Sequence, residues 1–332
     1  MKKLLKTLVS ALLALTMIFS LSACNRDYEG EINIYMPDGA PALAFSQLMH
    51  EENKLGKEEK LTYTVVPAAQ IGASVAGETA EVALIPVNAA VKLTEGKGDK
   101  YKLAAVITHG NLFILGTQEA TAVIALKGKT VAVPNLANVP GLTLKAILKK
   151  NNIEYTEDIT KKTSENVLLI DTGSEQTAAP AAATMVKTNI ADFAVIPEPA
   201  ATNLSKAQNL SVRLSLQTLW GEEGYPQAVL LVKKELTKDG KFVEALLDAI
   251  DESATWVKTH TVEAVTAISA HFVQDQATTL KAPALNETAI TNCNIKVEKA
   301  KSAKAKIKDY MERINAVGSA SFGTPQKDFF LD

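Results

Sequence analysis

The sequence predicts an α/β protein built as two lobes, and three observations indicate this. Short β-branched or apolar runs alternate with longer Ala-rich helical stretches, which is typical of largely parallel sheets. One phrase occurs twice, as EVALIP at 81–86 and DFAVIP at 192–197, each followed by two variable residues and Ala-Ala. The chain of 332 residues is also long enough for about two domains. Two copies without further repeats suggest two similar lobes rather than a solenoid.

Several runs are predicted as strands because they are short, rich in Val, Ile and Leu, and bounded by turn residues. They are 32–36, 62–67, 82–86, 103–109, 113–117, 130–134, 166–171, 193–197 and 228–234. Most intervals between them have room for one helix. From Asp239 onward apolar residues recur at helical spacing, so we expect the chain to finish in helices.

The chain is expected to cross twice between the lobes. The segment 126–134 follows the strand at 113–117, and the segment 219–231 precedes a strand that could return to the first sheet. We therefore assign lobe I to residues 31–116 plus 225–332, and lobe II to residues 117–224. The repeated phrase then falls once in each lobe.

The N-terminus has the pattern of a secretory signal. Three lysines in the first six residues precede the apolar segment 7–20, which is too short to span a bilayer comfortably. Leu21-Ser22-Ala23-Cys24 resembles the lipobox of bacterial lipoproteins. We expect residues 1–23 to be a signal peptide, Cys24 to carry the lipid, and residues 24–30 to be a tether.

Lipidation would hold the protein on the extracytoplasmic face of the cell membrane. The alternative is an ordinary cleaved signal in which Cys24 has no special role. No second apolar stretch in the sequence reaches membrane-spanning length, so we expect the mature body to be water-soluble.

Charge and cysteine content exclude several classes of protein. The chain has 35 Lys and Arg against 37 Asp and Glu, so the basic surface of a nucleic-acid-binding protein is absent. An acylated Cys24 would leave Cys293 without a disulfide partner. The four histidines have no metal-ligand spacing. We expect no metal site and no cofactor.

The repeated phrase predicts a ligand site. In an open α/β sheet, ligands bind beyond the carboxyl ends of the strands, and Pro ends a strand there because it has no N–H to donate. Asn88 and Glu198 occupy the variable positions of the two copies, so they are candidates for facing rims of one cleft. The alternative for either copy is a plain strand-to-helix turn, and Glu198 could equally be a hinge or helix-cap residue.

Other candidate ligand residues lie at neighbouring strand ends and helix starts. They are Asp38, Gly39, Ala40, Thr108, His109, Asn111, Asn135, Thr143, Thr172, Gly173 and Tyr225. His109 is more typical of a hydrogen-bonded structural histidine than of a ligand contact. The available aromatic residues are Tyr35, Phe113, Trp220 and Tyr225, for which core or hinge packing is the alternative. No Arg is evident at the predicted rims.

The motifs resemble a known superfamily in their order and spacing. These motifs are PDGAPALA (37–44), GETAEVALIP (77–86), LKGKTVAVPNLANVPGLTLKAILKKNNI (126–153), ADFAVIPEPAATNL (191–204) and YPQAVLLVKKEL (225–236). The chain resembles the type II periplasmic-binding-protein superfamily of ABC-importer solute receptors, in the nitrate, sulfonate, taurine and thiamine-precursor branch. The resemblance implies a clamshell of two Rossmann-like lobes joined by a two-strand hinge, which closes around a small molecule and delivers it to a membrane permease.

We therefore expect a lipid-anchored, monomeric solute receptor of an ABC importer for a small polar or anionic organic molecule. One alternative is an exported enzyme on the same scaffold. However, the sequence contains no Gly-x-Ser-x-Gly elbow, HExxH motif or paired Cys/His constellation, so no catalytic residue is assigned. The other alternative is a sensory lipoprotein, which would need the same cleft.

Overall fold

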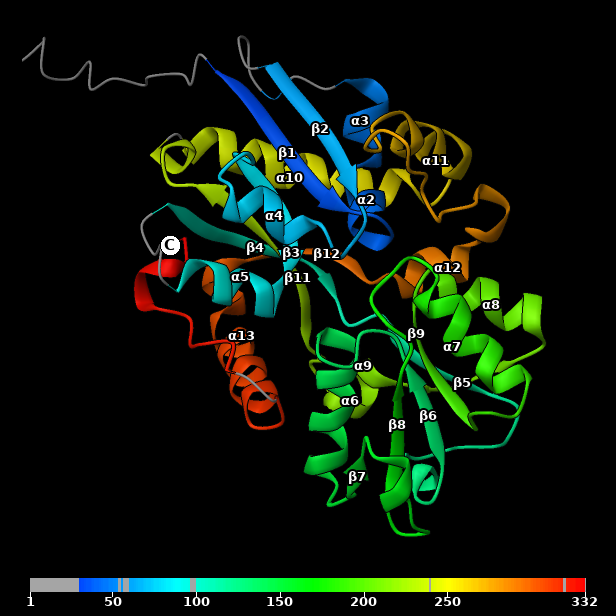
Figure 1. Cartoon of the computed structure of the whole chain (residues 1–332). Helices are drawn as coiled ribbons and strands as arrows, with labels where there is room; N and C mark the ends of the chain where they lie inside the picture. The colour runs from blue at the N-terminus through cyan, green and yellow to red at the C-terminus, as the bar shows by residue number, and fades with distance from the viewer. Residues whose placement is uncertain are drawn as a thin grey trace, which may run out of the picture.

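The computed structural model describes residues 30–52, 55, 60–95, 100–238, 240–318 and 321–331. The expected signal peptide, Cys24 and all of the tether except Gly30 lie outside these residues. The described chain forms two lobes, one containing the N-terminal strands and the C-terminal helices, and the other containing the middle of the chain (Figure 1). Across the described ranges, no helix combines the length and the hydropathy needed to cross a membrane.

The first lobe is built on a mixed six-stranded sheet, sheet A, with the order β12-β4-β11-β3-β1-β2. Its strands are β1 (Glu31–Pro37), β2 (Lys60–Val66), β3 (Val82–Pro86), β4 (Tyr101–His109), β11 (Pro226–Lys233) and β12 (Ile295–Lys299). Strand β1 pairs in parallel with β2 and β3, whereas β11 runs antiparallel to both β3 and β4.

The second lobe is built on sheet B, also six-stranded, with the order β10-β5-β9-β6-β8-β7. Its strands are β5 (Leu112–Gly116), β6 (Thr130–Val133), β7 (Tyr155–Thr156), β8 (Val167–Asp171), β9 (Phe193–Pro197) and β10 (Ser211–Ser215). Strand β6 pairs in parallel with β8 and β9, and β5 runs antiparallel to β9 and β10.

Helices cover both faces of each sheet, so strands such as β3 and β9 are buried on both sides and are apolar along their whole length. One face of sheet A carries α2 (Ala40–Ala44), α3 (Ser46–Glu51), α10 (Gly240–Trp256), α11 (Thr261–Ala270) and α12 (Glu287–Asn292); the other carries α4 (Ile71–Ala76), α5 (Val87–Thr94) and α13 (Ala300–Asn315). Sheet B lies between α6 (Val139–Lys150) with α9 (Leu216–Trp220), and α7 (Ala178–Lys187) with α8 (Ala200–Gln208). The α/β class, the two lobes and the C-terminal helices predicted from the sequence are confirmed.

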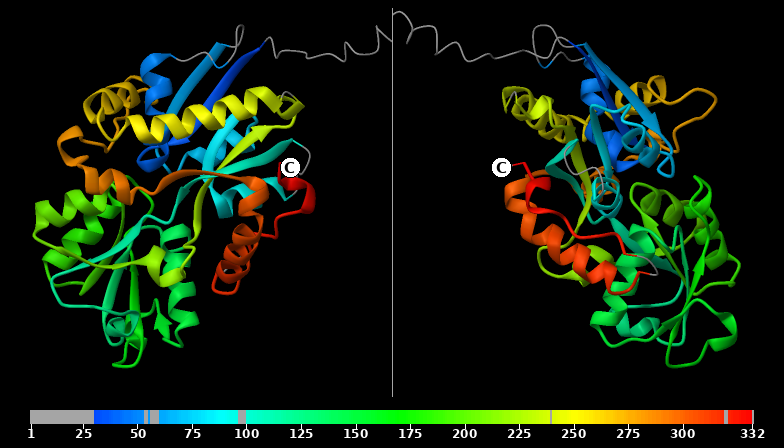
Figure 2. Two further views of the ribbon diagram at one scale, coloured as in Figure 1. Left: turned by 180° about the vertical axis from the view of Figure 1, so that it is seen from behind. Right: turned by 60° about the vertical axis from the view of Figure 1, so that its left-hand side comes forward.

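Helix α10 illustrates why the C-terminal segments are helical. Its buried residues Phe242, Val243, Leu246, Leu247 and Ile250 recur at intervals of three and four, which places them on one face. This face packs into the core that α10 shares with sheet A, α2 and α3. Figure 2 shows α10, in yellow, lying across the sheet.

The predicted strands are all present, with ends within two residues of the expected positions. Sequence analysis missed β7, β10 and β12, and each of these lies at an edge of its sheet. Strands β10 (SVRLS) and β12 (IKVEK) carry charged, partly exposed residues, which is how proteins keep sheet edges from pairing with other chains. Strand β7 has only two residues. Such segments lack the continuous apolar run by which the central strands were found.

The expected boundary between the lobes at residues 116–117 is wrong. Residues 112–116 form β5, which pairs with β9 and β10 in sheet B and not with any strand of sheet A. The chain therefore passes between the sheets at Gly110 and Asn111. A Cβ at Gly110 would collide with the ring of Tyr225, so this passage needs a glycine because of close packing.

The repeated phrase occupies the same position in both sheets. Strands β3 and β9 each have a parallel neighbour on one side, β1 or β6, and an antiparallel neighbour on the other, β11 or β5. Pro86 at the end of β3 lies opposite Ala228, and Pro197 at the end of β9 lies opposite Leu112. The two lobes are therefore built alike around these strands.

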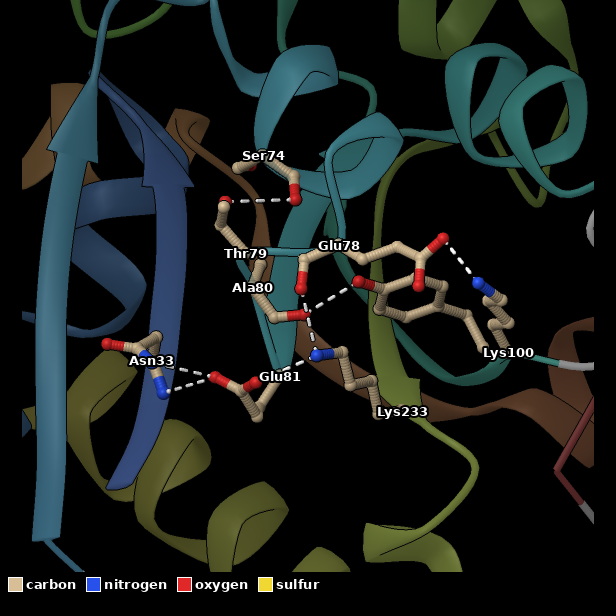
Figure 3. Close-up of polar contacts among 9 residues, drawn as sticks. Asn33, Ser74, Glu78, Thr79, Ala80, Glu81, Lys100 and Lys233 are labelled. Atoms are coloured by element: carbon tan, nitrogen blue, oxygen red, sulfur yellow. Dashed lines mark hydrogen bonds and ion pairs between the residues drawn. The ribbon is translucent and has the colours of Figure 1, made fainter. Parts of the chain in front are cut away.

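The acid that begins each copy of the phrase fixes the start of its strand. Glu81 donates its N–H to the carbonyl of Asn33 (2.9 Å), and its Oε2 accepts from the Asn33 N–H (3.0 Å) and Nδ2 (2.8 Å). Its Oε1 accepts from Lys233 Nζ at 2.8 Å, as Figure 3 shows. The carboxylate thus joins β3 to β1 on one side and to β11 on the other.

Asp192 makes the equivalent contacts in sheet B. Its N–H donates to the carbonyl of Thr130 (2.9 Å), and its Oδ2 accepts from the Thr130 N–H (2.8 Å). Its Oδ1 accepts from Gln118 Nε2 (2.8 Å) and lies 3.8 Å from Lys129 Nζ. The sequence pattern contained both acids, but their shared role depends on residues of the neighbouring strands.

Replacing Glu81 by Gln, or Asp192 by Asn, should destabilise the fold. Each substitution removes a charged acceptor from a half-buried network, which typically costs about 1–3 kcal/mol. Chemical denaturation at pH 7 measures this loss. Glu31→Gln is the control, because its carboxylate is solvent-exposed and, among the described residues, is bound by Lys60 and Thr62. This substitution should change the unfolding midpoint little.

The effect of Glu81→Gln should also depend on pH. Partial burial alone would raise the pKa of Glu81, but the hydrogen bonds from Lys233 and Asn33 outweigh burial and lower its pKa below 4.5. The stabilisation is therefore present above pH 4.5 and is lost as the pH falls through the lowered value. A difference between wild type and variant that stays constant down to pH 3 would contradict this assignment.

Candidate ligand site between the two sheets

The carboxyl ends of strands from both sheets meet in one region between the lobes. Asn88 lies in the first turn of α5, directly after β3, and Asn138 caps the N-terminus of α6 after β6. Asn88 Nδ2 donates to Asn138 Oδ1 at 2.9 Å, so the two rims are in direct contact here. The repeated phrase placed Asn88 at a rim opposite Glu198, whereas the hydrogen-bond partner of Asn88 across the lobes is Asn138.

Two further hydrogen bonds join loops of the two lobes in this region. Gln176, in the loop after β8, donates from Nε2 to the carbonyl of Ala277 at 3.2 Å. Asn292, at the end of α12, donates from Nδ2 to Glu198 Oε1 at 3.4 Å. These contacts come from loops at three different strand ends of sheet B, so the rims approach each other along the whole region.

The side-chain amide of Asn88 has a defined orientation. Asn138 Oδ1 also accepts the Val139 N–H at 2.8 Å, so this atom is an acceptor and the Asn88 atom facing it must be the nitrogen. Asn88 Oδ1 is therefore the free end of the amide. Asn88 is 2 % exposed, and among the described residues this oxygen has no hydrogen-bond partner.

Asn111 is oriented in the same way at the passage between the sheets. Its Nδ2 points at the carbonyl of Glu198 (3.4 Å), while its backbone carbonyl accepts the Glu198 N–H (2.9 Å). Asn111 is 2 % exposed and its Oδ1 finds no partner in the described part of the chain, and the same holds for Oγ1 of the buried Thr108. Buried polar atoms without partners are rare, so these atoms are available to a ligand or to water.

Glu198 is buried beside the passage between the sheets at Gly110 and Asn111, so it does not line an open rim opposite Asn88 as expected. Its carboxylate accepts from the N–H (2.9 Å) and Oγ1 (2.7 Å) of Thr202 and from Asn292. Burial raises the pKa of Glu198, although these hydrogen bonds oppose the shift. The helix-cap contact left open by the sequence is present, and it joins α8 to α12.

Asp38 follows β1 and is held by the loop that precedes α12. Its Oδ1 accepts from Thr278 Oγ1 (2.6 Å), and its Oδ2 accepts from the N–H and Oγ1 of Thr279 (2.7 Å each). Gly39 has a φ of +96° and Ala40 begins α2, so the chain turns sharply there. Asp38 therefore fixes the loop that touches Gln176 of the other lobe.

The loops of sheet B support one another. Asn135, with a φ of +54°, donates its N–H to the carbonyl of Gly173 at 2.7 Å, and Thr172 Oγ1 donates to the carbonyl of Ala178 at 2.9 Å. Asn135, Thr172 and Gly173 thus lie at adjacent strand ends, as expected. The Thr143 hydroxyl is buried against Tyr310 Oη (2.9 Å), so its role is to join α6 to α13.

His109 is held by the edge strand β12. Its Nε2 lies 3.2 Å from the carbonyl of Lys296, and its Nδ1 lies 3.9 Å from Glu298 Oε2. Burial lowers the pKa of His109, and the nearby Glu298 opposes the shift only in part. His109 is therefore a hydrogen-bonded structural residue in this structure, which is the alternative to ligand contact given in the sequence analysis.

Tyr225 belongs to an aromatic cluster at the hinge. Its ring stacks on Tyr310 (centroids 5.7 Å apart, planes at 14°) and lies 5.5 Å from Trp220, over which the Arg313 guanidinium sits at 3.4 Å. Tyr225 and Trp220 therefore pack beside the passage between the sheets. This is the hinge packing that the sequence analysis gave as the alternative to ligand contact. Phe113 packs against the core beneath α7 and α8.

Tyr35 lines an open groove between sheet A and α4. The groove has a volume of about 550 Å³ and is lined by Tyr35, Val66, Ala69, Gln70, Ala73, Ser74 and Thr79. Asp38 donates its N–H to the carbonyl of Val66 at 2.9 Å, so the groove reaches the strand ends that form the rim. Sequence analysis missed Val66, Ala69 and Gln70, and the position of this loop at the end of a predicted strand was the signal that could have found them.

Among the described residues, no group of three or more His, Cys, Asp or Glu side chains is arranged to hold a metal ion. The candidate site therefore consists of amide, hydroxyl and carboxylate groups on loops from both sheets.

Asn138→Ala should weaken both the α6 cap and the contact between the lobes. Loss of the cap costs about 1 kcal/mol, and Asn88 loses its partner. Asn138→Asp should retain stability, because a carboxylate can accept both hydrogen bonds. Denaturation and the small-angle scattering radius measure the two effects. Asn286→Ala is the matched control, since it removes the α12 cap without touching the other lobe; an equal radius change in this control would refute the contact's role.

No protein-family model matches the chain, and no curated protein matches it in sequence. Solved structures do match it. An ABC transporter protein from Parabacteroides distasonis is 18% identical over 91% of this chain and 98% of that one, with a TM-score of 0.70. The periplasmic aliphatic sulphonate-binding protein SsuA of Escherichia coli is 12% identical over 92% and 93% of the two chains, with a TM-score of 0.64.

The same fold also occurs in the Candida albicans CA3427 gene product, which is described as having the generic periplasmic-binding-protein fold. It is 9% identical over 88% of this chain and 92% of that one, with a TM-score of 0.55. At these identities the similarity concerns the fold and not the ligand. The chain therefore has the two-lobed fold of periplasmic binding proteins, as the resemblance in sequence implied.

Proposed function

We propose that this protein is the solute receptor of an ABC importer, which closes its two lobes around a small polar organic molecule and delivers it to a permease. The observation that carries this proposal is the contact between strand-end loops of two separate sheets, centred on Asn88 and Asn138. The free oxygens of Asn88 and Asn111 support it, because they are buried where a bound molecule would touch both lobes. The ABC-transporter proteins among the structural neighbours add support.

The hinge follows from the connectivity. The chain passes between the sheets only at residues 109–112 and 220–226 in the continuous described segment 100–238. Rotation about these two passages would separate Asn88 from Asn138 without disturbing either sheet. A ligand that touches both rims stabilises the closed form, because it makes its full set of contacts only there.

Helix α13 limits how far the lobes can open. It packs on sheet A, yet Tyr310 contacts Thr143 of α6, and Lys149 Nζ donates to the carbonyl of Ala316 at 3.0 Å. Figure 2 shows α13 extending beside the second lobe. The hinge region is thus stiffened where α13 meets α6.

The candidate ligand contacts proposed here are Asn88, Thr108, Asn111, the Asp38–Gly39 turn, and the loop containing Thr172 and Gly173. All of them belong to one chain, so a monomer contains a whole site. We further propose that the lipobox at Cys24 anchors the protein to the extracytoplasmic face of the membrane, where a permease would receive the ligand.

Ligand binding should raise the melting temperature and reduce the scattering radius together. A ligand at 100 times its dissociation constant stabilises a protein by about 2.7 kcal/mol. Thermal unfolding and small-angle scattering across a metabolite library measure both effects. Turnover of a bound compound, or stabilisation without any change in radius, would argue against a receptor that works by closure.

Cys24→Ser should release the protein from membranes. The substitution removes the sulfur that would carry the acyl chains, and each buried methylene contributes about 0.8 kcal/mol to membrane binding. Fractionation of expressing bacteria, with Cys293→Ser as the matched control, measures the change. A wild-type protein found wholly in the soluble fraction would contradict lipidation but leave the receptor proposal intact.

A further inference from the structure

The loops that follow seven strands at the candidate site carry carboxylates and no lysine or arginine. These loops follow β1, β2, β3, β4, β6, β8 and β9, and they are 37–41, 66–70, 86–89, 109–111, 134–139, 171–177 and 197–202. They contain Asp38, Asp171, Glu175 and Glu198, and their only basic residue is His109. The loop that holds Asp38 adds one acid, Asp275, and one base, Lys281. The formal charge of these rims is therefore negative.

The bonded carboxylates of this group are held by neutral donors. Asp38 accepts from Thr278 and Thr279, and Asp171 Oδ1 accepts from the N–H groups of Leu136 (3.2 Å) and Gly173 (2.9 Å). Glu198 accepts from Thr202 and Asn292, as described above. Within the described ranges, none of these acids forms an ion pair with Lys or Arg.

Acids elsewhere in the protein differ in this respect. Glu81 pairs with Lys233 at 2.8 Å, and Glu298 pairs with Lys306 at 3.0 Å. These partly buried carboxylates on the sheets thus have a lysine partner.

The acids of the seven loops have no such partner within the described ranges. Asp38 is partly buried and Glu198 is buried, whereas Asp171 and Glu175 are exposed. A buried acid without a counterion is costly unless a cation binds beside it, and this cost concerns Asp38 and Glu198.

A second, independent observation points to the same ligand chemistry. The unpartnered atoms of Asn88 and Asn111 are oxygens, since their nitrogens face acceptors. Both side chains are 2 % exposed; Asn88 contacts Asn138 of the other lobe, and Asn111 contacts Glu198. Amide oxygens and carboxylates are acceptors, so a complementary molecule presents N–H donors and positive charge.

We propose that the ligand is an organic cation, with an ammonium, amidinium or guanidinium group bound among these acceptors. This inference rests on the proposed receptor function and names the class of its ligand. The groove lined by Tyr35, Val66, Ala69 and Ala73 adjoins Asp38 and suits a small apolar body attached to the cation. An anionic molecule would bring like charge to carboxylates that have no counterion, so this class is disfavoured.

Fractionated yeast extract tests the charge of the ligand without knowledge of its identity. Ion-exchange resins at pH 7 divide the extract into cationic, neutral and anionic fractions, and each is added to exhaustively dialysed full-length protein in detergent. We expect the cationic fraction alone to raise the melting temperature. A rise with the anionic or neutral fraction instead would overturn the proposal while supporting a receptor. No rise with any fraction would count against the receptor function itself.

Charge-neutralising variants test which acids contribute to ligand binding. Asp38→Asn and Glu198→Gln preserve side-chain shape, and each should weaken binding of the active fraction about tenfold. Glu154→Gln is the control, because it removes one exposed carboxylate before β7, at the opposite end of sheet B, and should have less than about a twofold effect. Equal effects in all three variants, or none in Asp38→Asn and Glu198→Gln, would refute the assignment. Since each variant's melting temperature without extract reports its folding, a folding defect is recognised separately.

Discussion

The register of two central strands, β3 and β9, determines where the candidate site lies. Each strand is fixed at its start by an acid, Glu81 or Asp192, and stops at a proline that cannot continue the ladder. Because side chains alternate along a strand, a shift of one residue would exchange the side chains that pack into the cores on the two faces of each sheet. The same shift would move Asn88 and Glu198 away from their partners, so the fold and the site depend on one alignment.

The contact between lobes combines two kinds of interaction. Single hydrogen bonds, such as Asn88 to Asn138, join the rims and can be exchanged for contacts with a ligand or water. The cluster of Trp220, Tyr225 and Tyr310 instead buries large rings at the hinge, where separation would expose much more apolar surface. A hinge held more firmly than the rims suits the opening and closing proposed above.

The charge distribution separates the structural acids from those at the rims. Along the sheets, carboxylates are paired with lysines and contribute to the fold. At the strand ends they are held by hydroxyl and amide donors, which position the oxygens but leave the charge in place. The neighbour that binds sulphonates shares the fold of this chain. A common architecture is therefore compatible with rims of different charge, because the loops are not part of the sheets.

The sequence by itself determined the α/β class, the central strands and the strand-end loops that were predicted as rims. The reason is that apolar periodicity and the Pro or Gly residues of turns are local signals. The sequence did not determine the edge strands β10 and β12, because their charged, partly exposed residues do not form an apolar run. It also did not determine that β5 belongs to sheet B, because this depends on pairing with β9. Only the tertiary structure decided that Thr143, His109 and Tyr225 pack within the protein while Asn88 and Asn111 keep free oxygens. The physical reason is that hydrogen-bond satisfaction depends on partners far away in the chain.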